Sequence, residues 1–307
     1  MPRRSVREAL TFSQPSSHSP QHNLPVVPET ALEVRRQIRE SLGLAPVPET
    51  RPTFPVEGHV CDFPLWSYSK KRSRETVLLI DYEDSSFFRL DAPKGMPSPR
   101  FPGYLDVILF FGQRDLFIQE TTALSVYRIF QELRLDPGNG GNYKQFHRDM
   151  ERSFFMALIT DRFRNPVTGE RSHVDYFRVM RRMRLAKNRR EESIFEFDGL
   201  FLQSLRVGYL KRLDFDFCLW LGSEAKALER FFYGHLLKRM GEKGSYTRNL
   251  LGFLRDCGLG HIADMPKWRR NEALKEVVFP ALDLMQGKAI QGYERDDRGN
   301  IIFFPPG

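Results

Sequence analysis

The alternation of apolar and polar residues is most informative between residues 142 and 190. Apolar residues at its start recur at steps of three or four, which is the spacing of one buried helix face. These residues are Tyr143, Phe146, Met150 and Phe154. Two strand-like runs follow, at 157–164 and 172–181, and the joint at 165–170 contains the Pro and Gly that a hairpin turn requires. The pattern therefore predicts a helix followed by a β-hairpin.

The same segment is strongly basic. It holds 13 Lys plus Arg against 5 Asp plus Glu, a net charge of +8. The whole chain is also +8, so the rest of it sums to zero. On the predicted helix, Lys144, Arg148 and Arg152 recur at steps of four and form a stripe separate from the apolar face. A solvated surface can carry such a stripe, but its combination with a basic hairpin favours DNA binding, in which the helix enters the major groove and the hairpin follows the backbone.

The N-terminal segment, residues 1–55, has the composition of a disordered tail. It contains 9 of the 20 prolines, and the tetrapeptide VPET occurs at 27–30 and again at 47–50. A short amphipathic helix between the two copies could instead be a docking peptide for a partner protein. Its anchors would be Leu32, Val34, Ile38 and Leu42. We favour the tail.

The segment from 56 to 92 reads as strands, at 65–71, at 74–82 and at 87–91. Asp81, Glu83 and Asp84 form an acidic cluster there. Because no His or fourth ligand stands nearby in the sequence, we interpret the cluster as a strand end and a turn rather than a metal site.

Two helices are predicted before the basic one. The first starts near Pro102 and buries Leu105, Ile108 and Leu109; the second runs from Thr121 to about Leu135. The sequence DPGNGG at 136–141 breaks the second helix. Helix, helix, breaker, basic helix and hairpin is the order of a winged helix.

The second half repeats this plan. The run 213–221 alternates apolar residues with aspartates, which predicts a half-buried strand. Ser223 is the expected cap of a helix through Met240, and a shorter helix follows at 249–258. Asp264 is the expected cap of a third helix, with Pro266 in its first turn and a kink at Pro280. A hairpin around 296–299 closes the chain.

These elements predict an α+β protein of two tandem winged-helix domains with a Pro-rich disordered tail. We place the tail at 1–55, the first domain with its N-terminal strands at 56–190, and the second domain at 191–307. A length of 307 residues with 41% hydrophobic residues suffices for two cores.

Composition narrows the environment and the partners. A pI near 9.4 favours a polyanionic partner. No apolar run approaches the roughly 20 residues that span a bilayer, and the N-terminus has no apolar core of a secretory signal. Three isolated cysteines, Cys61, Cys218 and Cys257, favour a reducing cytoplasm over a disulfide framework or zinc site. We therefore expect a cytoplasmic protein without a membrane partner.

Catalytic motifs are not found in the sequence. It contains no phosphate-binding GxxxxGK[ST] loop, no HExxH and no GxSxG, so we expect no enzyme activity, no cofactor and no bound metal. Glu196 and Asp198 lie two apart on a predicted strand and could serve a nuclease, but solvated carboxylates on an edge strand are the simpler interpretation. Trp220 and Trp268 are expected to be core or helix-anchor residues, and His147 could contact DNA or be solvated.

The candidate DNA contacts are basic or amide side chains of the two predicted helices and hairpins. In the first domain they are Lys144, Gln145, Arg148, Arg152, Arg162, Arg164, Arg171, Arg178, Arg181 and Arg182. In the second domain, where acidic residues offset the charge, they are Lys267, Arg269, Arg270, Lys275, Arg295 and Arg298.

From residue 57 to 286 the chain resembles the plasmid replication initiators of the RepA and TrfA type, which carry two winged-helix domains. The resemblance rests on four stretches: Gly95-Met96-Pro97-Ser98 before Asp106-Val107-Ile108, the helix of Asn142 and Tyr143 with Arg148 and Phe154, the run 213–221, and 223–238 with Tyr233. These motifs are diffuse and include no invariant catalytic signature.

This resemblance implies sequence-specific binding to direct repeats of a replication origin in double-stranded DNA. Binding would open an adjacent AT-rich segment and recruit the host initiator and helicase. Lys144, Gln145, Arg148 and Arg152 would read the major groove, with half-sites roughly 10 base pairs apart. A homodimer is a further possibility. The alternatives are a winged-helix transcription regulator without a replication role, which would use the same residues, and a metal-dependent nuclease.

Overall fold

The structure is a computed structural model that describes residues 53–57, 61, 63–68, 76–82, 85–114, 117–162, 173–199, 201 and 210–306. It is an α+β protein, as predicted, with helices and small antiparallel sheets. Most of the predicted tail and its alternative docking helix lie outside these residues. The last residues of that tail, from Thr53, belong to a strand.

The first unit is a run of three helices and three strands. In chain order these are α2 (Phe101–Phe111), β6 (Thr121–Ser125), α3 (Val126–Glu132), α4 (Gly140–Phe155), β9 (Met180–Arg184) and β10 (Glu192–Phe197). The strands form a three-stranded antiparallel sheet of order β6-β10-β9, so the first strand pairs with the last. The predicted helices at Pro102 and at 143–154 are confirmed.

The second unit has a similar order of elements, with one additional short helix. It comprises α7 (Ala227–Lys243), β12 (Tyr246–Asn249), α8 (Leu250–Asp256), the short α9 (Gly260–Ala263), a long helix, and strands β13 (Gly292–Arg295) and β14 (Asn300–Phe304). The long helix continues through α10 (Lys267–Ala273), η2 (Leu274–Val278) and α11 (Phe279–Asp283). The sheet order β12-β14-β13 again pairs the first strand with the last. The predicted closing hairpin is confirmed.

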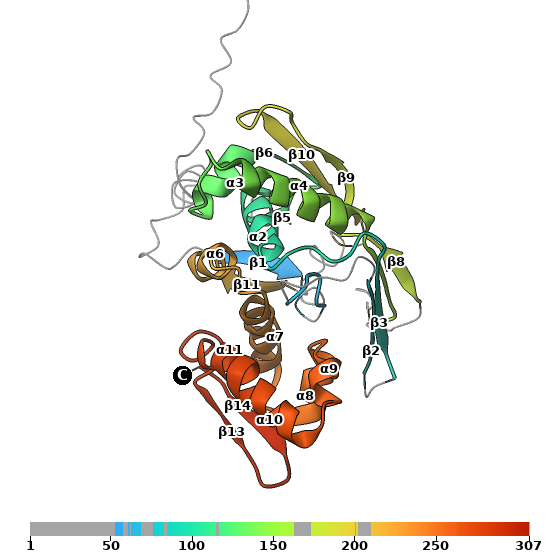
Figure 1. The fold of residues 1–307 in the computed structure, drawn as a ribbon, viewed down its shortest axis with the longest axis vertical. Helices are drawn as coiled ribbons and strands as arrows, with labels where there is room; N and C mark the ends of the chain where they lie inside the picture. The colour runs from blue at the N-terminus through green and yellow to red at the C-terminus, as the bar shows by residue number, and fades with distance from the viewer. Residues whose placement is uncertain are drawn as a thin grey trace, which may run out of the picture.

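A further sheet of four strands lies beside the first unit (Figure 1). Its order is β2-β3-β7-β8, from β2 (Thr76–Asp81), β3 (Phe87–Ala92), β7 (Ala157–Thr160) and β8 (Asp175–Phe177). The predicted basic hairpin is present as the pair β7 and β8, but the predicted run 172–181 divides between two sheets, because β9 pairs with β10 instead. A small hairpin, β4 (Gln113–Arg114) and β5 (Phe117–Ile118), follows α2.

The two units are joined through α2, α6 and α7. Strand β1 (Thr53–Glu57) pairs with β11 (Leu210–Asp214), which leads into α6 (Phe215–Ser223), and α6 packs on α2. Figure 1 shows α7 running from this junction to the second unit at the opposite end of the molecule. The buried side chains form one continuous core. Strand β10 lies beyond residue 190 but pairs with β6 and β9, which precede it.

The predicted single helix from Thr121 to Leu135 is wrong. Residues up to Ser125 form β6, in which Thr122 and Leu124 alternate inward and pair with β10. The Oγ of Ser125 then accepts a hydrogen bond from the amide of Arg128 and caps α3. Pairing with a distant strand therefore overrides the local helical pattern.

The predicted strand at 213–221 is also wrong beyond Asp214. The carboxylate of Asp214 accepts a hydrogen bond from the amide of Phe217 and caps α6. The residues buried on α6 include Phe215, Cys218 and Gly222, a helical spacing that coexists with the alternation seen in the sequence. Ser223 ends α6 rather than capping the next helix, which begins at Ala227 after Ala225 adopts a positive φ of 56°.

Three smaller expectations also change. Residues 65–68 of the predicted strand at 65–71 form no strand. The neighbours Leu65 and Trp66 are both buried, which breaks the alternation of a strand, and Trp66 Nε1 donates to the carbonyl of Ala227. Asp264 ends α9 and does not cap α10. Pro280, which lacks an N–H, is the second residue after the π-helical stretch η2, whose wider turn accommodates it.

Candidate nucleic-acid interface

Helix α4 is fixed to the first unit by its aromatic face. Tyr143, Phe146 and Met150 are buried, and the ring of Phe146 lies 5.1 Å from that of Tyr104 on α2, edge to face. Asn139 accepts a hydrogen bond from the amide of Gly141 and caps the helix. The apolar face predicted from the sequence is therefore the buried one, and it orients the rest of the helix.

A buried carboxylate locks the helix to the preceding segment. Asp149 accepts hydrogen bonds from the amide of Ser98 at 2.8 Å and from its hydroxyl at 2.5 Å. Gln145 Nε2 donates to the same carboxylate at 2.8 Å. The amide of Gln145, predicted to read DNA, is thus engaged within the protein and orients Asp149.

The outer face of α4 borders a groove. Lys144, His147 and Arg148 are exposed along it, and the far wall comes from the end of β9 and the turn that follows. The groove encloses about 840 Å³. Its lining is Gly140, Tyr143, Lys144, His147, Arg148, Glu151, Phe154, Phe155, Met183, Leu185 and Arg189. An apolar floor with a cationic rim is a surface that a polyanion can contact.

Arginines from the neighbouring strands and turn stack on aromatic rings at this surface. Arg189 lies 4.2 Å above the ring of Tyr143, and Arg178 lies 5.8 Å from that of Phe154. Arg190 similarly covers Tyr127 at 5.6 Å. Each cation–π contact holds a guanidinium against a ring while the side chain stays exposed, so the cations are positioned rather than freely rotating.

Strand β9 contributes a second group of arginines. Arg182 and Arg184 are exposed and two apart, so they share a face of the strand. Arg181, also exposed, forms ion pairs with Glu120 at 2.7 Å and with Glu196. Those two carboxylates neutralise Arg181, which leaves Arg182 and Arg184 as the cationic positions of β9.

Two further predicted contacts have structural roles. Arg152 donates to the backbone carbonyls of Lys94 and Met96, at 3.1 and 3.3 Å. Arg162 is only 7% exposed; its guanidinium lies 3.7 Å above the ring of Tyr82, and it donates to Ser86. We therefore leave Arg152 and Arg162 out of the candidate surface. Arg164 and Arg171 lie outside the described residues.

His147 sits within the cationic stripe. Partial burial lowers the pKa of its imidazole below the ordinary value of 6.5. The ring is therefore neutral at pH 7 and gains its charge only in acid.

The second unit presents a comparable helix with less charge. Lys267, Arg269 and Lys275 are exposed on α10 and η2. Arg270 is instead turned back, donating to the carbonyls of Ala263 and Met265 at 3.1 and 3.3 Å. Arg295 and Arg298 are exposed on the β13–β14 hairpin.

Trp268 is the clearest departure from expectation. Its side chain is 65% exposed, so it is not a core or anchor residue. The predicted core role of Trp220 is likewise incomplete, since Trp220 is 41% exposed and stacks on Phe217 at 5.8 Å.

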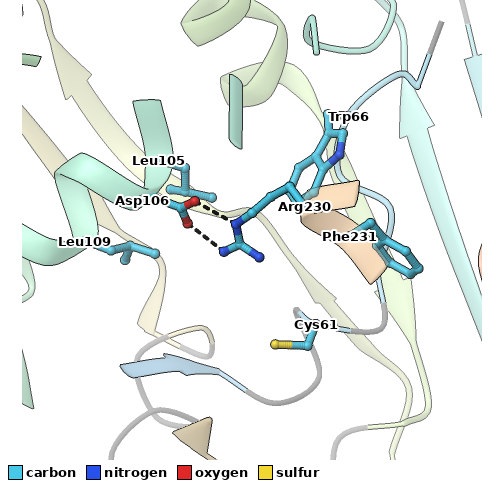
Figure 2. Close-up of a pocket in the computed structure, with 7 residues that line it drawn as sticks. All are labelled: Cys61, Trp66, Leu105, Asp106, Leu109, Arg230 and Phe231. Carbon is cyan, nitrogen blue, oxygen red and sulfur yellow. Dashed lines mark hydrogen bonds and ion pairs between the residues drawn. The ribbon is translucent and has the colours of Figure 1, made fainter. Parts of the chain in front are cut away.

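A buried ion pair joins the two halves of the molecule (Figure 2). Arg230 of α7 donates from Nε and Nη2 to the two carboxylate oxygens of Asp106 on α2, each at 2.6 Å. Burial raises the pKa of Asp106, and Arg230 opposes that effect. The space beside the pair, lined also by Cys61 and Trp66, is about 10 Å³, so it holds no ligand larger than water. We assign the pair to structure.

The carboxylates considered for a nuclease are arranged differently from the expectation. Glu196 lies on β10, the central strand of its sheet rather than an edge, and it pairs with Arg181. Within the described residues, no cluster of three or more His, Cys, Asp or Glu could hold a metal ion. Glu83 and Asp84 of the other acidic cluster lie outside these residues.

The described part of the chain also has no helix long and apolar enough to cross a membrane.

Comparison with solved structures shows a likeness in fold to domains of RctB. A selenomethionine derivative of domains 2 and 3 of RctB superposes with a TM-score of 0.51 over 79% of this chain and 95% of that chain, at 13% identity. The fold resembles that of RctB domains 2 and 3. A second structure of the same domains, RctB-155-483, gives a TM-score of 0.47, 10% identity, and coverage of 81% and 96%. No protein-family model and no curated protein sequence matches the chain. At this identity the likeness to RctB concerns the fold.

Several residues of the candidate surface were missing from the set predicted as DNA contacts. They are Arg184, Lys187, Arg189 and Arg190, in β9 and the turn after it, together with Tyr143, on which Arg189 stacks. Their signal in the sequence was the continuation of the basic run to residue 190. What the sequence could not show is that this run forms a turn between two paired strands beside α4.

Proposed function

We propose that this protein is a DNA-binding replication initiator of the plasmid type, composed of two tandem winged-helix domains. The observation that carries the proposal is the cationic surface of the first unit. Lys144 and Arg148 on α4 line the same groove as Arg189, in the basic turn at 185–191, and Arg182 and Arg184 are exposed on β9, the strand before this turn. Cations from a helix, a strand and the turn between paired strands spread over an extended surface, which suits a duplex better than a small anion.

The winged-helix assignment draws support from the order of elements. Apart from the short α9 of the second unit, both units have the order helix, strand, helix, helix, strand, strand, and in each sheet the first strand pairs with the last. In this scheme α4 and the helix at 267–283 are the recognition helices. The wings are the hairpins β9–β10 and β13–β14, and the β7–β8 pair is an insertion. The likeness to a two-domain fragment of RctB agrees with two domains.

The proposed contacts follow from exposure. Lys144 and Arg148 enter the major groove, where lysine and arginine pair with guanine. The wing arginines and Lys187 neutralise phosphates beside it. The second unit reads the next part of the site, so half-sites lie roughly one helical turn, about 10 base pairs, apart.

The replication role rests on the resemblance to plasmid initiators. Binding to direct repeats of an origin would open an adjacent AT-rich segment and recruit the host initiator and helicase, and the protein would need no catalytic activity of its own. The same binding could repress its own promoter. A homodimer would let two copies occupy neighbouring repeats.

A footprint on DNA flanking the gene tests the proposal, repeated from about 50 to 200 mM salt. We expect protection of evenly spaced repeats that survives the higher salt. Diffuse protection that disappears with salt would show that the surface binds polyanions without sequence preference, which would contradict the proposal. Transfer of the protected DNA and the gene to a plasmid without an origin then separates an initiator from a transcription regulator, because only an initiator restores replication.

A further inference from the structure

An exposed tryptophan stands at the beginning of the helix that the proposed function makes the second recognition helix. Trp268 is 65% exposed, while the opposite face of the same helix is buried through Leu274, Val278 and Leu282. Arg270 holds the first turns in place through the carbonyls of Ala263 and Met265. The tryptophan is thus held on a rigid element and points away from the core, where a partner can reach it.

The residues beside Trp268 are of types that contact DNA bases and phosphates. The guanidinium of Arg269 lies 5.0 Å from the ring of Trp268, which keeps a cation beside it. Lys267, Asn271 and Lys275, spaced by four, are all exposed and form one stripe next to Trp268. Asn is the side chain that pairs with N6 and N7 of adenine, and apolar side chains contact the methyl group of thymine.

The charge of this helix favours base edges over phosphates. Its exposed cations are Lys267, Arg269 and Lys275, and the exposed acids Glu272, Glu276 and Asp283 leave no net charge (three minus three). Glu272 follows Trp268 by one helical turn and would repel a phosphate placed there. A nearly neutral face gains little from running along a DNA backbone, whereas a helix in the major groove meets base edges first.

We propose that Trp268 and Asn271 recognise A·T base pairs in the major groove, Trp268 through the thymine methyl and Asn271 through the adenine edge. This inference rests on the proposed function and names the part of the site that the second unit reads. The exposed lysines beside them contact the flanking phosphates.

The test uses the full chain and a duplex that it selects from a random-sequence pool. Trp268→Ala and Asn271→Ala are compared with wild type on this duplex. The control is Trp220→Ala, which removes another partly exposed tryptophan from α6. We expect each of the first two variants to bind about tenfold more weakly, and the control to bind as wild type does. Because Trp268 is mostly exposed, its variant should melt at the wild-type temperature.

Uracil in place of thymine isolates the methyl contact. Each thymine of the selected duplex is replaced in turn, which removes only the methyl group. Wild type should lose affinity at one or two positions, and Trp268→Ala should lose nothing further at those positions. Equal sensitivity of wild type and Trp268→Ala at every position, or wild-type affinity of Trp268→Ala, would overturn the proposal.

The experiment also separates this inference from the proposed function. If the pool yields no preferred sequence, the proposed function fails together with the inference. If a sequence is selected and Lys144→Ala weakens binding but Trp268→Ala does not, the function stands and the inference fails. In that outcome Trp268 would be a contact for a protein partner instead.

Discussion

Gly103 and Gly222 bring the backbones of α2 and α6 into direct contact. A Cβ added to Gly103 would lie 2.8 Å from the Cα of Gly222, and one added to Gly222 would lie 2.6 Å from the Cα of Gly103. Such distances do not occur between real side chains and backbone, so the two helices can meet this closely only at a pair of glycines. This contact helps join the two halves of the chain.

Gly222→Ala should therefore destabilise the protein. The added methyl meets backbone, which cannot rotate away, and we expect a loss of about 1–3 kcal/mol in the free energy of unfolding. Chemical denaturation measures it. Gly199→Ala is the matched control, because nothing lies within 4 Å of the Cβ that it adds. Equal stability of Gly222→Ala and wild type would show that α6 shifts without cost.

Arg230→Met should be more damaging, because it leaves Asp106 buried without its partner. We expect a loss of about 3–5 kcal/mol near pH 7. The double variant Asp106→Leu plus Arg230→Met should recover much of this, since no charge then remains buried. If the double variant is no more stable than Arg230→Met, the loss of stability comes from altered packing and not from the unpaired charge.

The loss in Arg230→Met should depend on pH. Burial already raises the pKa of Asp106, and removing Arg230 takes away the group that opposes this rise. A folded pKa above the unfolded value gives stability that is present below the unfolded pKa and lost as pH rises through the folded one. The gap from wild type should thus be smallest near pH 4 and widen toward neutrality. Denaturation at several pH values measures it.

Lys144→Ala plus Arg148→Ala should weaken DNA binding without unfolding the protein. Both side chains are exposed on α4, so their loss removes contacts but no packing. If both neutralise phosphates in addition to reading bases, the slope of log affinity against log salt should flatten by about 2. Arg89→Ala, on the separate four-stranded sheet, controls for loss of surface charge.

Arg152→Ala should behave in the opposite way. Its guanidinium holds two backbone carbonyls of the 94–96 segment. We expect a lower melting temperature and little change in the salt dependence of DNA binding. Weaker binding at an unchanged melting temperature would instead indicate that Arg152 contacts DNA.

Acid should strengthen DNA binding through His147. Because burial lowers the pKa of this imidazole, the added positive charge appears only below the ordinary value of 6.5. We expect a rise in affinity of roughly 2- to 10-fold between pH 7 and pH 5.5. His147→Gln should remove most of this rise, as measured by fluorescence anisotropy. An unchanged pH dependence in His147→Gln would place the ring outside the contact.

The elements that could be predicted from the sequence are those whose periodicity agrees with their environment. The buried face of α4 and the closing hairpin β13–β14 are of this kind. Residues 121–125 and 215–221 were misassigned because each carries a pattern that fits both a helix and a strand. A distant partner, β10, decides the first, and the cap at Asp214 decides the second.

The positive charge of the candidate site could be predicted from the sequence, but the arrangement of its side chains could not. Lys144 and Arg148 were found because their stripe is separate from the apolar face. Arg152 has the same spacing, yet it is withdrawn by the carbonyls of Lys94 and Met96, residues more than fifty positions away. The exposure of Trp268 was missed because apolar character normally signals burial, and only the structure shows that this side chain points outward.

In the proposed complex, helix α7 sets the distance between the two DNA-binding units. Its first turn is clamped to α2 by the pair of Arg230 and Asp106, and its 17 residues span about 26 Å toward the second unit. A rigid helix between two DNA-binding units fixes the distance between them. It also fixes the rotation of one unit relative to the other about the DNA axis. One base pair inserted between the half-sites turns one of them by about 35° relative to the other. Such a protein would tolerate base changes within its site more readily than a single insertion between the two halves.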